Sequence, residues 1–216
     1  MHYTDLLKKA LRREPLTASQ ALDLYLNVPV ADLPAVADAL RREAVPDPGV
    51  VTWQIDRNVN ITNVCISGCR FCNFHCKPHQ KERAYITSME EYSRKIDKML
   101  LLGGDQLLLQ GGLHPEVDIV FYEGLFCSLK TKYPNVRLHA LGAPEVAHIA
   151  RISSLSIRET LERLREAGLD SLPGAGAEIL CEEVRHRISP NKPGTQAWLD
   201  VMREAHRMNF PTSATM

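Results

Sequence analysis

Apolar residues in the first fifty positions recur at helical spacing. Thr17 and Gln20 form a capping-box pattern ahead of the apolar run 21–26, and a second helix is expected to begin near Asp32. The segment 45–49, Val-Pro-Asp-Pro-Gly, is expected to end that helix. The pattern therefore predicts a helical cap, residues 1–49, ahead of the main domain.

From residue 50 onward, short apolar runs alternate with amphipathic stretches. The pattern predicts strands at 59–64, 106–110, 136–141, 170–172 and 211–216, and helices at 88–102, 116–132, 156–168, 177–187 and 195–208. Capping pairs, Ser88 with Glu91 and Ser156 with Glu159, support two of the helices. Such alternation predicts an α/β fold with parallel strands joined by right-handed crossovers.

The number of predicted strands favours an incomplete barrel over residues 50–216. About five strand positions are present, whereas a closed (β/α) barrel has eight and usually takes about 250 residues. The last predicted element is a strand with no helix after it, which would leave an open parallel edge. We therefore expect the chain to hold the N-terminal part of a TIM-type barrel.

Composition and charge limit the kinds of partner and the cell compartment that we expect for this chain. Of 216 residues, 44% are hydrophobic and 24% charged, and 26 Lys and Arg balance 26 Asp and Glu, so no net charge favours nucleic acid or anionic lipid. No apolar run is long enough for a membrane span, and the first residues lack a signal-peptide pattern. Four of the six cysteines lie between 65 and 76, too close together to join distant elements, so we expect a reducing cytoplasm.

The segment 65–72, Cys-Ile-Ser-Gly-Cys-Arg-Phe-Cys, carries the most specific chemistry. It follows a predicted strand and therefore lies at the carboxyl edge of the sheet, where barrel enzymes place their active sites. Thiolates of Cys65, Cys69 and Cys72 can bind three irons of a [4Fe-4S] cluster. The fourth iron would then remain open to a small molecule.

Two alternatives for this segment stay open. Zinc sites also use cysteines, although they more often have two separated pairs. Cys76 could bind the fourth iron, and the closed cluster would then only carry electrons. Cys127 and Cys181 lie within apolar runs and are expected to be core residues.

Polar residues near predicted strand ends are candidates for contacting substrate or moving a proton. They are His114, His139, Glu145 and His148. Glu145 and His148 are three residues apart and could share one helix face, and a surface pair explains them equally well. His139 could also be a hydrogen-bonded core histidine.

The motifs together resemble a known family. The Cys65–Cys72 spacing resembles that of the radical S-adenosylmethionine (SAM) enzymes. Residues 56–65, 108–115 and 168–180 resemble strand motifs of the futalosine-pathway enzymes of menaquinone biosynthesis and their deazaflavin-synthase relatives. The nearest resemblance is to the cyclic dehypoxanthinyl futalosine synthase family, which Gln110 and the run 139–141 favour over the sibling aminofutalosine synthase. Family members continue well past residue 216.

The resemblance implies a [4Fe-4S] cluster on Cys65, Cys69 and Cys72, with SAM on the open iron. Gly111 and Gly112 would let backbone approach the methionine part of SAM. Phe71 would support the adenine. Glu178 would accept hydrogen bonds from the ribose, unless it only favours a helix dipole.

The implied reaction is a radical cyclisation. A 5′-deoxyadenosyl radical would abstract hydrogen from the ribose of dehypoxanthine futalosine, and the sugar radical would close a spiro ring. The resemblance also implies a small-molecule substrate and an electron donor such as flavodoxin or ferredoxin, with no nucleic-acid or membrane partner. The aminofutalosine synthase, a four-cysteine electron carrier and an inactive fragment remain alternatives.

Overall fold

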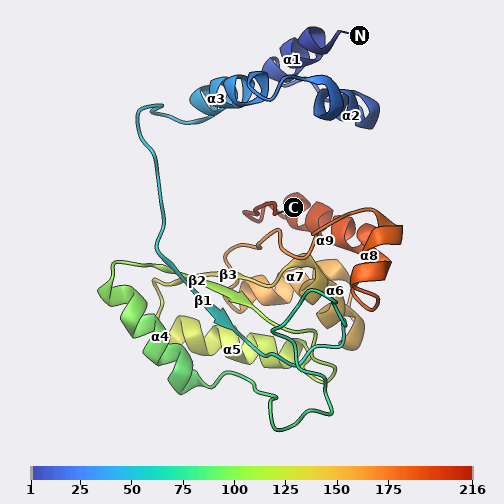
Figure 1. Ribbon diagram of the computed structural model, residues 1–216. Coiled ribbons are helices and arrows are strands. Elements are labelled where there is room, and N and C mark those ends of the chain that lie inside the picture. The colour runs from blue at the N-terminus through green and yellow to red at the C-terminus, as the bar shows by residue number, and fades with distance from the viewer. Residues whose placement is uncertain (1, 216) are drawn as a thin grey trace. The chain divides into compact units, whose positions relative to one another are not determined.

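The computed structural model describes residues 2–215, and the chain divides into two compact units, Met1–Trp53 and Gln54–Met216. The first unit holds three helices, α1 (Tyr3–Leu11), α2 (Ala18–Asn27) and α3 (Asp32–Ala44) (Figure 1). The predicted capping box is present, because Thr17 accepts from the Gln20 amide and the Gln20 side chain accepts from the Thr17 amide. A small core of Leu6, Leu24 and Val28 joins α1 and α2.

The second unit is built on a parallel sheet. Its strands β1 (Asp56–Asn60), β2 (Gln106–Gln110) and β3 (Arg137–Ala140) pair in sequence order. Beyond β3, single parallel bridges join His139 to Ser171 and Leu172 to Thr212. Within residues 2–215, the predicted fourth and fifth strands are therefore short contacts that extend the sheet in the expected order.

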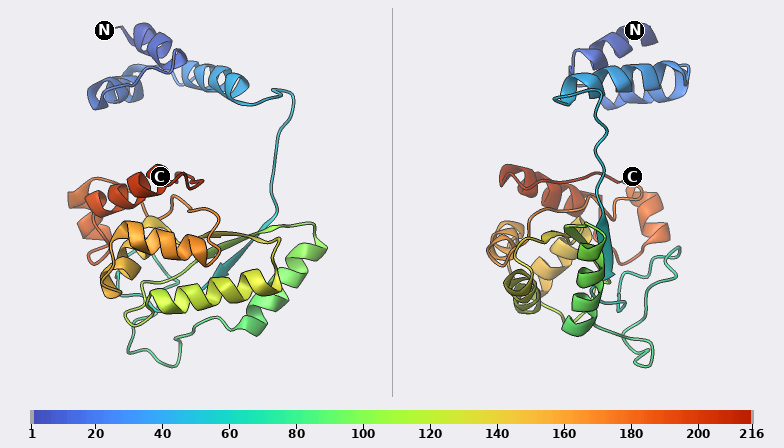
Figure 2. Two further views of the ribbon diagram at one scale, coloured as in Figure 1. Left: turned by 180° about the vertical axis from the view of Figure 1, so that it is seen from behind. Right: turned by 90° about the vertical axis from the view of Figure 1, so that its left-hand side faces the viewer.

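Helices pack on one face of this sheet. They are α4 (Met89–Leu101), α5 (Ile119–Lys132), α6 (Ala143–Ile152), α7 (Ile157–Glu166) and α9 (Thr195–Arg207). The short helix α8 (Glu182–Ile188) precedes α9 and contributes no residue to this core. Side chains alternate along β2, so Leu107 and Leu109 are fully buried in the core with Phe126 of α5. Gln110 lies on the opposite face. Figure 2 shows α4 and α5 along the helical side of the sheet.

The predicted α/β fold is confirmed, and several boundaries differ. The first strand spans Asp56–Asn60 rather than 59–64, because its partner β2 ends at Gln110 and the ladder stops there. α5 begins at Ile119 after an Asp118 cap. α8 begins only at Glu182. α6 is an additional helix, since Gly142 and Pro144 begin a helix without a capping-box pattern.

The expectation that Cys127 and Cys181 are core residues is wrong, because both are exposed. Cys127 follows the buried Phe126 and is rotated about 100° away from the core face of α5. Cys181 is the N-cap residue of α8. None of the helices in the described residues is long and apolar enough to cross a membrane.

Candidate functional site

The cysteine segment is held beside the end of β2. Beyond β1, the Ile61 amide donates to the Gln110 carbonyl at 2.7 Å, and the Gly112 amide donates to the Thr62 carbonyl at 2.8 Å. The approach is so close that a Cβ on Gly112 would overlap the Val64 carbonyl and lie 2.8 Å from the Cys65 Cβ. Glycine is therefore required at 112 for steric reasons, and the cysteine segment starts directly against it.

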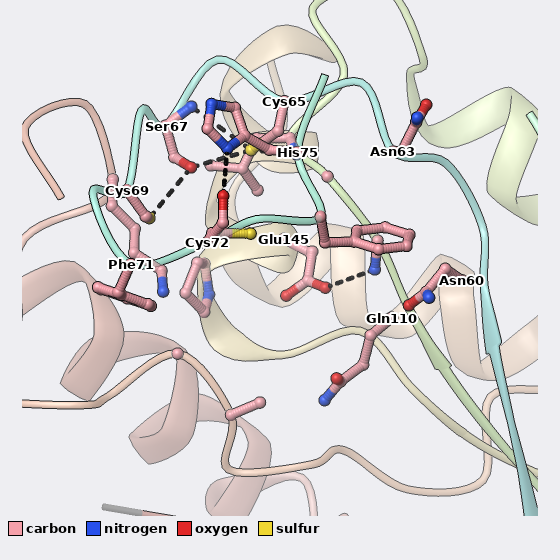
Figure 3. Close-up of a pocket in the computed structure, with 18 of the residues that line it drawn as sticks. Asn60, Asn63, Cys65, Ser67, Cys69, Phe71, Cys72, His75, Gln110 and Glu145 are labelled. Carbon is pink, nitrogen blue, oxygen red and sulfur yellow. Dashed lines mark hydrogen bonds between the residues drawn. The ribbon is translucent and has the colours of Figure 1, made fainter. Parts of the chain in front are cut away.

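A cavity of about 320 Å³ opens at this edge of the sheet (Figure 3). All the predicted cluster and SAM residues line it, namely Cys65, Cys69, Cys72, Phe71, Gly111, Gly112 and Glu178. Glu145 lines it as well. These residues come from separate parts of the chain, so the fold gathers three thiols, a glycine edge and two carboxyl groups around one space.

Two of the three cysteine sulfurs, those of Cys65 and Cys69, have hydrogen-bonding partners. Ser67 Oγ lies 2.9 Å from Cys65 Sγ and 3.3 Å from Cys69 Sγ, and the Leu113 amide donates to Cys65 Sγ at 3.3 Å. Donors to sulfur stabilise the thiolate and tune the group bound to it. Cys72 is partly exposed, whereas Cys65 and Cys69 are buried.

Cys76 does not line the cavity in this structure. It is fully buried, and its thiol donates to the carbonyls of Lys77 and Gln80 at 3.4 and 3.3 Å. Its backbone pairs with the cysteine segment, since its amide donates to Asn63 and its carbonyl accepts from Cys65. These contacts give Cys76 a structural role in holding the loop.

The loop after α8 holds the other side of the cysteine segment. Asn191 Nδ2 donates to the Ile66 carbonyl at 3.2 Å, and the Asn191 amide donates to the Ser67 carbonyl at 3.1 Å. The Arg70 amide donates to the Ile188 carbonyl at 2.8 Å. Residues more than a hundred positions apart therefore fix the backbone that carries Cys65 and Cys69.

Glu145 is a buried carboxyl group in the first turn of α6. It accepts a hydrogen bond from the Gly111 amide at 3.2 Å, which places it beside the glycine edge (Figure 3). Burial raises the pKa of Glu145 to about 7, and this outweighs the hydrogen bonds and the charge of Lys192, which lower it. The group is thus poised to exchange a proton near neutral pH.

Glu178 lies in a loop at the rim of the cavity. Because α8 begins at Glu182, the alternative that Glu178 only favours a helix dipole is wrong. Lys192 Nζ donates to both carboxylate oxygens of Glu178 at 2.9 Å. The buried guanidinium of Arg185 donates to the carbonyls of Gly176 and Ala177 at 3.0 and 2.7 Å, which fixes the loop that carries Glu178.

The histidine candidates lie outside this cavity. His139 is on β3, where its Nδ1 lies 2.7 Å from Ser171 Oγ, and burial lowers its pKa. His148 donates from Nε2 to the His114 carbonyl at 2.7 Å, and its Nδ1 faces Arg151 at 3.2 Å. His148 therefore has a structural role, and Glu145 is the one predicted catalytic candidate that lines the cavity.

Sequence reasoning missed several residues around the cavity. Asn60, Asn63, Ser67, His75 and Lys192 line it and were not predicted. His75 donates from Nδ1 to the Cys72 carbonyl at 2.7 Å. Asn60 could have been predicted as a cavity residue from its position at the end of β1. Lys192 could not, because its place at the cavity depends on contacts between residues distant in sequence.

The donor set fits a cubane cluster. Within residues 2–215, no three His, Cys, Asp or Glu side chains converge closely enough to share a single ion. A cubane does not require such convergence, because each thiolate binds a different iron atom. Three soft donors with amide and hydroxyl groups at their sulfurs suit that group.

Comparison with known proteins identifies the family. The sequence profile of the Radical SAM superfamily matches residues 59–216. The chain belongs to the Radical SAM superfamily. The resemblance predicted from the cysteine spacing is confirmed at this level.

Curated relatives match almost all of the chain. Cyclic dehypoxanthine futalosine synthase of Streptomyces coelicolor is 39% identical over 212 residues, covering 98% of this chain and 53% of the relative. A 5-amino-6-(D-ribitylamino)uracil–L-tyrosine 4-hydroxyphenyl transferase of Methanosarcina acetivorans is 38% identical, with 98% and 54% covered. FO synthase of Mycobacterium leprae is 38% identical, with 99% and 25% covered. The chain thus spans about half the length of the first two relatives.

Solved structures share the fold. Methylornithine synthase superposes with a TM-score of 0.66 at 17% identity, covering 96% of this chain and 57% of that one. HydG, a maturase of the [FeFe]-hydrogenase, gives 0.68 at 16% identity, with 96% and 44% covered. The radical SAM barrel architecture is confirmed, with a partial sheet in this chain.

Proposed function

We propose that the protein is a radical SAM enzyme whose cluster is held by Cys65, Cys69 and Cys72. The observation that carries the proposal is the shared cavity, which brings these three thiols together with Gly111, Gly112 and Glu145. When bound, the cluster and SAM supply an electron and a 5′-deoxyadenosyl radical for hydrogen abstraction. The cavity residues bind and orient the ligands and limit the access of water.

Each side of the cavity has a proposed role. The glycine edge at 111–112 lines the cavity, and its lack of side chains lets the backbone of residues 62–65 pack directly against it. Phe71 offers an aromatic face at the opening, and Glu178 with Lys192 offers a carboxylate and an ammonium group for ribose or carboxylate recognition. Glu145 holds or releases a proton beside Gly111.

We propose dehypoxanthine futalosine as the substrate and its cyclisation as the reaction. Similarity to cyclic dehypoxanthine futalosine synthases supports this choice. The polar end of the open sheet face also supports it, because Asn60 and Gln110 are paired neighbours in the ladder and both line the cavity. Their amides would bind the hydroxyl groups of a sugar.

A second candidate is a deazaflavin-type reaction on a 5-amino-6-(D-ribitylamino)uracil. The specific observation in its favour is that a relative named for transferring a 4-hydroxyphenyl group to this uracil matches the chain at 38% identity, nearly the same level as the cyclic dehypoxanthine futalosine synthases. Both candidates require the same cluster and SAM. They differ in the substrate that must enter the cavity.

The test is turnover by anaerobically reconstituted protein with SAM and each substrate in turn. We expect 5′-deoxyadenosine and the spiro product with dehypoxanthine futalosine, detected by mass spectrometry, and only background 5′-deoxyadenosine with 5-amino-6-(D-ribitylamino)uracil and tyrosine. A Cys72→Ser variant should form neither product. The reverse substrate preference would support the second candidate and exclude the first.

A further inference from the structure

The three cysteines line two separate hollows. One is the cavity with Gly111, Gly112 and Glu145. The other, which we call the outer hollow, is about 590 Å³ and is lined by Arg70, Lys77 and His79 as well as Cys65, Cys69 and Cys72. A cluster on these thiols would therefore border both the ligand cavity and a second hollow lined by basic residues.

The cysteine segment and the turn after it carry cations that form no ion pair within residues 2–215; Arg70 and Lys77 line the outer hollow, and Lys81 and Arg83 follow in the turn. Arg70, Lys77, Lys81 and Arg83 are exposed, and we call these four residues the basic rim. Among the ion pairs of residues 2–215, none involves a member of the basic rim. In the segment 66–85, Glu82 is the one acidic residue. The positive charge of this surface is thus available to a partner.

Hydrogen bonds fix the backbone of the turn that carries most of the basic rim. The Cys76 thiol donates to the Gln80 carbonyl at 3.3 Å, and the Arg83 amide donates to the same carbonyl at 3.0 Å. Asn63 Nδ2 donates to the Arg83 carbonyl at 2.7 Å, which ties the turn back to the start of the cysteine segment. Lys77, Lys81 and Arg83 are therefore presented from one compact turn directly after the cysteines.

We propose that the basic rim docks an acidic one-electron carrier protein, which reduces the cluster through the outer hollow. This inference rests on the proposed function. In the step, the carrier is oxidised by one electron and the cluster is reduced from the 2+ to the 1+ state, with no bond made or broken. Electron-transfer partners bind through small, transient interfaces whose association rate depends on charge complementarity, and an unpaired basic rim beside the thiols provides it.

The test measures cluster reduction in reconstituted holoprotein by flavodoxin hydroquinone, an acidic flavin protein, using stopped-flow absorbance. We expect Lys77→Glu and Lys81→Glu each to lower the bimolecular rate by at least about threefold at low ionic strength, with the difference lost in high salt. Lys98→Glu is the matched control. Lys98 is also exposed but lies in the last turn of α4, near Gly103 and away from the cysteine edge. The rate of cluster reduction in Lys98→Glu should therefore equal that of the wild type.

Two further readouts separate this inference from the proposed function. Iron content and the extent of reduction by excess dithionite should be equal in all variants, which shows that cluster assembly is intact. Equal flavodoxin rates for wild type, Lys77→Glu and Lys81→Glu would overturn the docking surface, as would an equal loss in Lys98→Glu. A wild-type protein that binds no iron would instead contradict the proposed function.

Discussion

At the residue scale, the distinction between Cys72 and Cys76 would decide which kind of cluster the proposed site holds. Cys72 lines the cavity, whereas the Cys76 thiol is buried and bonded to backbone carbonyls. We predict that Cys76→Ser keeps full iron and sulfide content after anaerobic reconstitution and lowers the free energy of unfolding by about 1 kcal/mol. Cys72→Ser should lose most of the cluster. Loss of the cluster in both variants would instead indicate a closed, four-cysteine site.

Glu145 gives a pH-dependent contribution to stability. Its pKa is raised by burial from 4.5 to about 7, so the native state binds more protons than the unfolded state between these values. The stabilisation from protonated Glu145 is present below about pH 4.5 and is lost as pH rises through 7. Relative to Glu145→Gln, the cluster-free wild type should lose roughly 3 kcal/mol of unfolding free energy over that interval.

Chemical denaturation of both proteins between pH 4.5 and 8 checks the Glu145 prediction. The glutamine variant removes the titrating proton while keeping the size of the side chain and an oxygen that can accept from the Gly111 amide. Parallel stability profiles for the two proteins would mean that Glu145 does not carry a raised pKa.

At the element scale, the close contact between β2 and the cysteine segment positions the thiols. A methyl group at Gly112 would overlap the Val64 carbonyl, whereas one at Gly111 would lie 3.2 Å from the Thr62 nitrogen. Gly112→Ala should therefore destabilise the protein by about 1–3 kcal/mol and reduce cluster content, and Gly111→Ala should have a smaller effect on both. Thermal unfolding and iron analysis measure the two effects. Equal behaviour of the two variants would contradict the proposed contact.

Helix starts marked by capping residues close together in the sequence could be predicted, whereas the end of the first strand, which depends on its partner strand, could not. Thr17 with Gln20 and Ser156 with Glu159 form the expected capping boxes, because capping depends on residues three apart. The apolar residues Ile61 and Val64 suggested a longer first strand. Both are buried, but they lie beyond the β1–β2 ladder, and Val64 forms a single parallel bridge with Cys76 instead.

At the scale of the whole molecule, the site combines local and distant parts of the chain. That the three cysteines share one cavity could be predicted, because they lie within eight residues. The hydrogen bond from Asn191 to the cysteine segment and the pairing of Lys192 with Glu178 could not be predicted. Both depend on how the loop after α8 returns to the sheet edge. Burial of Glu145 against Gly111 likewise becomes visible only once α6 is placed.

The central claim is that the three thiols hold a cluster whose remaining iron binds SAM within the cavity. Electron paramagnetic resonance of reconstituted, reduced protein with and without SAM tests it most directly. We predict a [4Fe-4S]⁺ signal whose g-values shift when SAM is added. A cluster signal that is identical with and without SAM, or a protein that takes up zinc but no iron, would contradict the account.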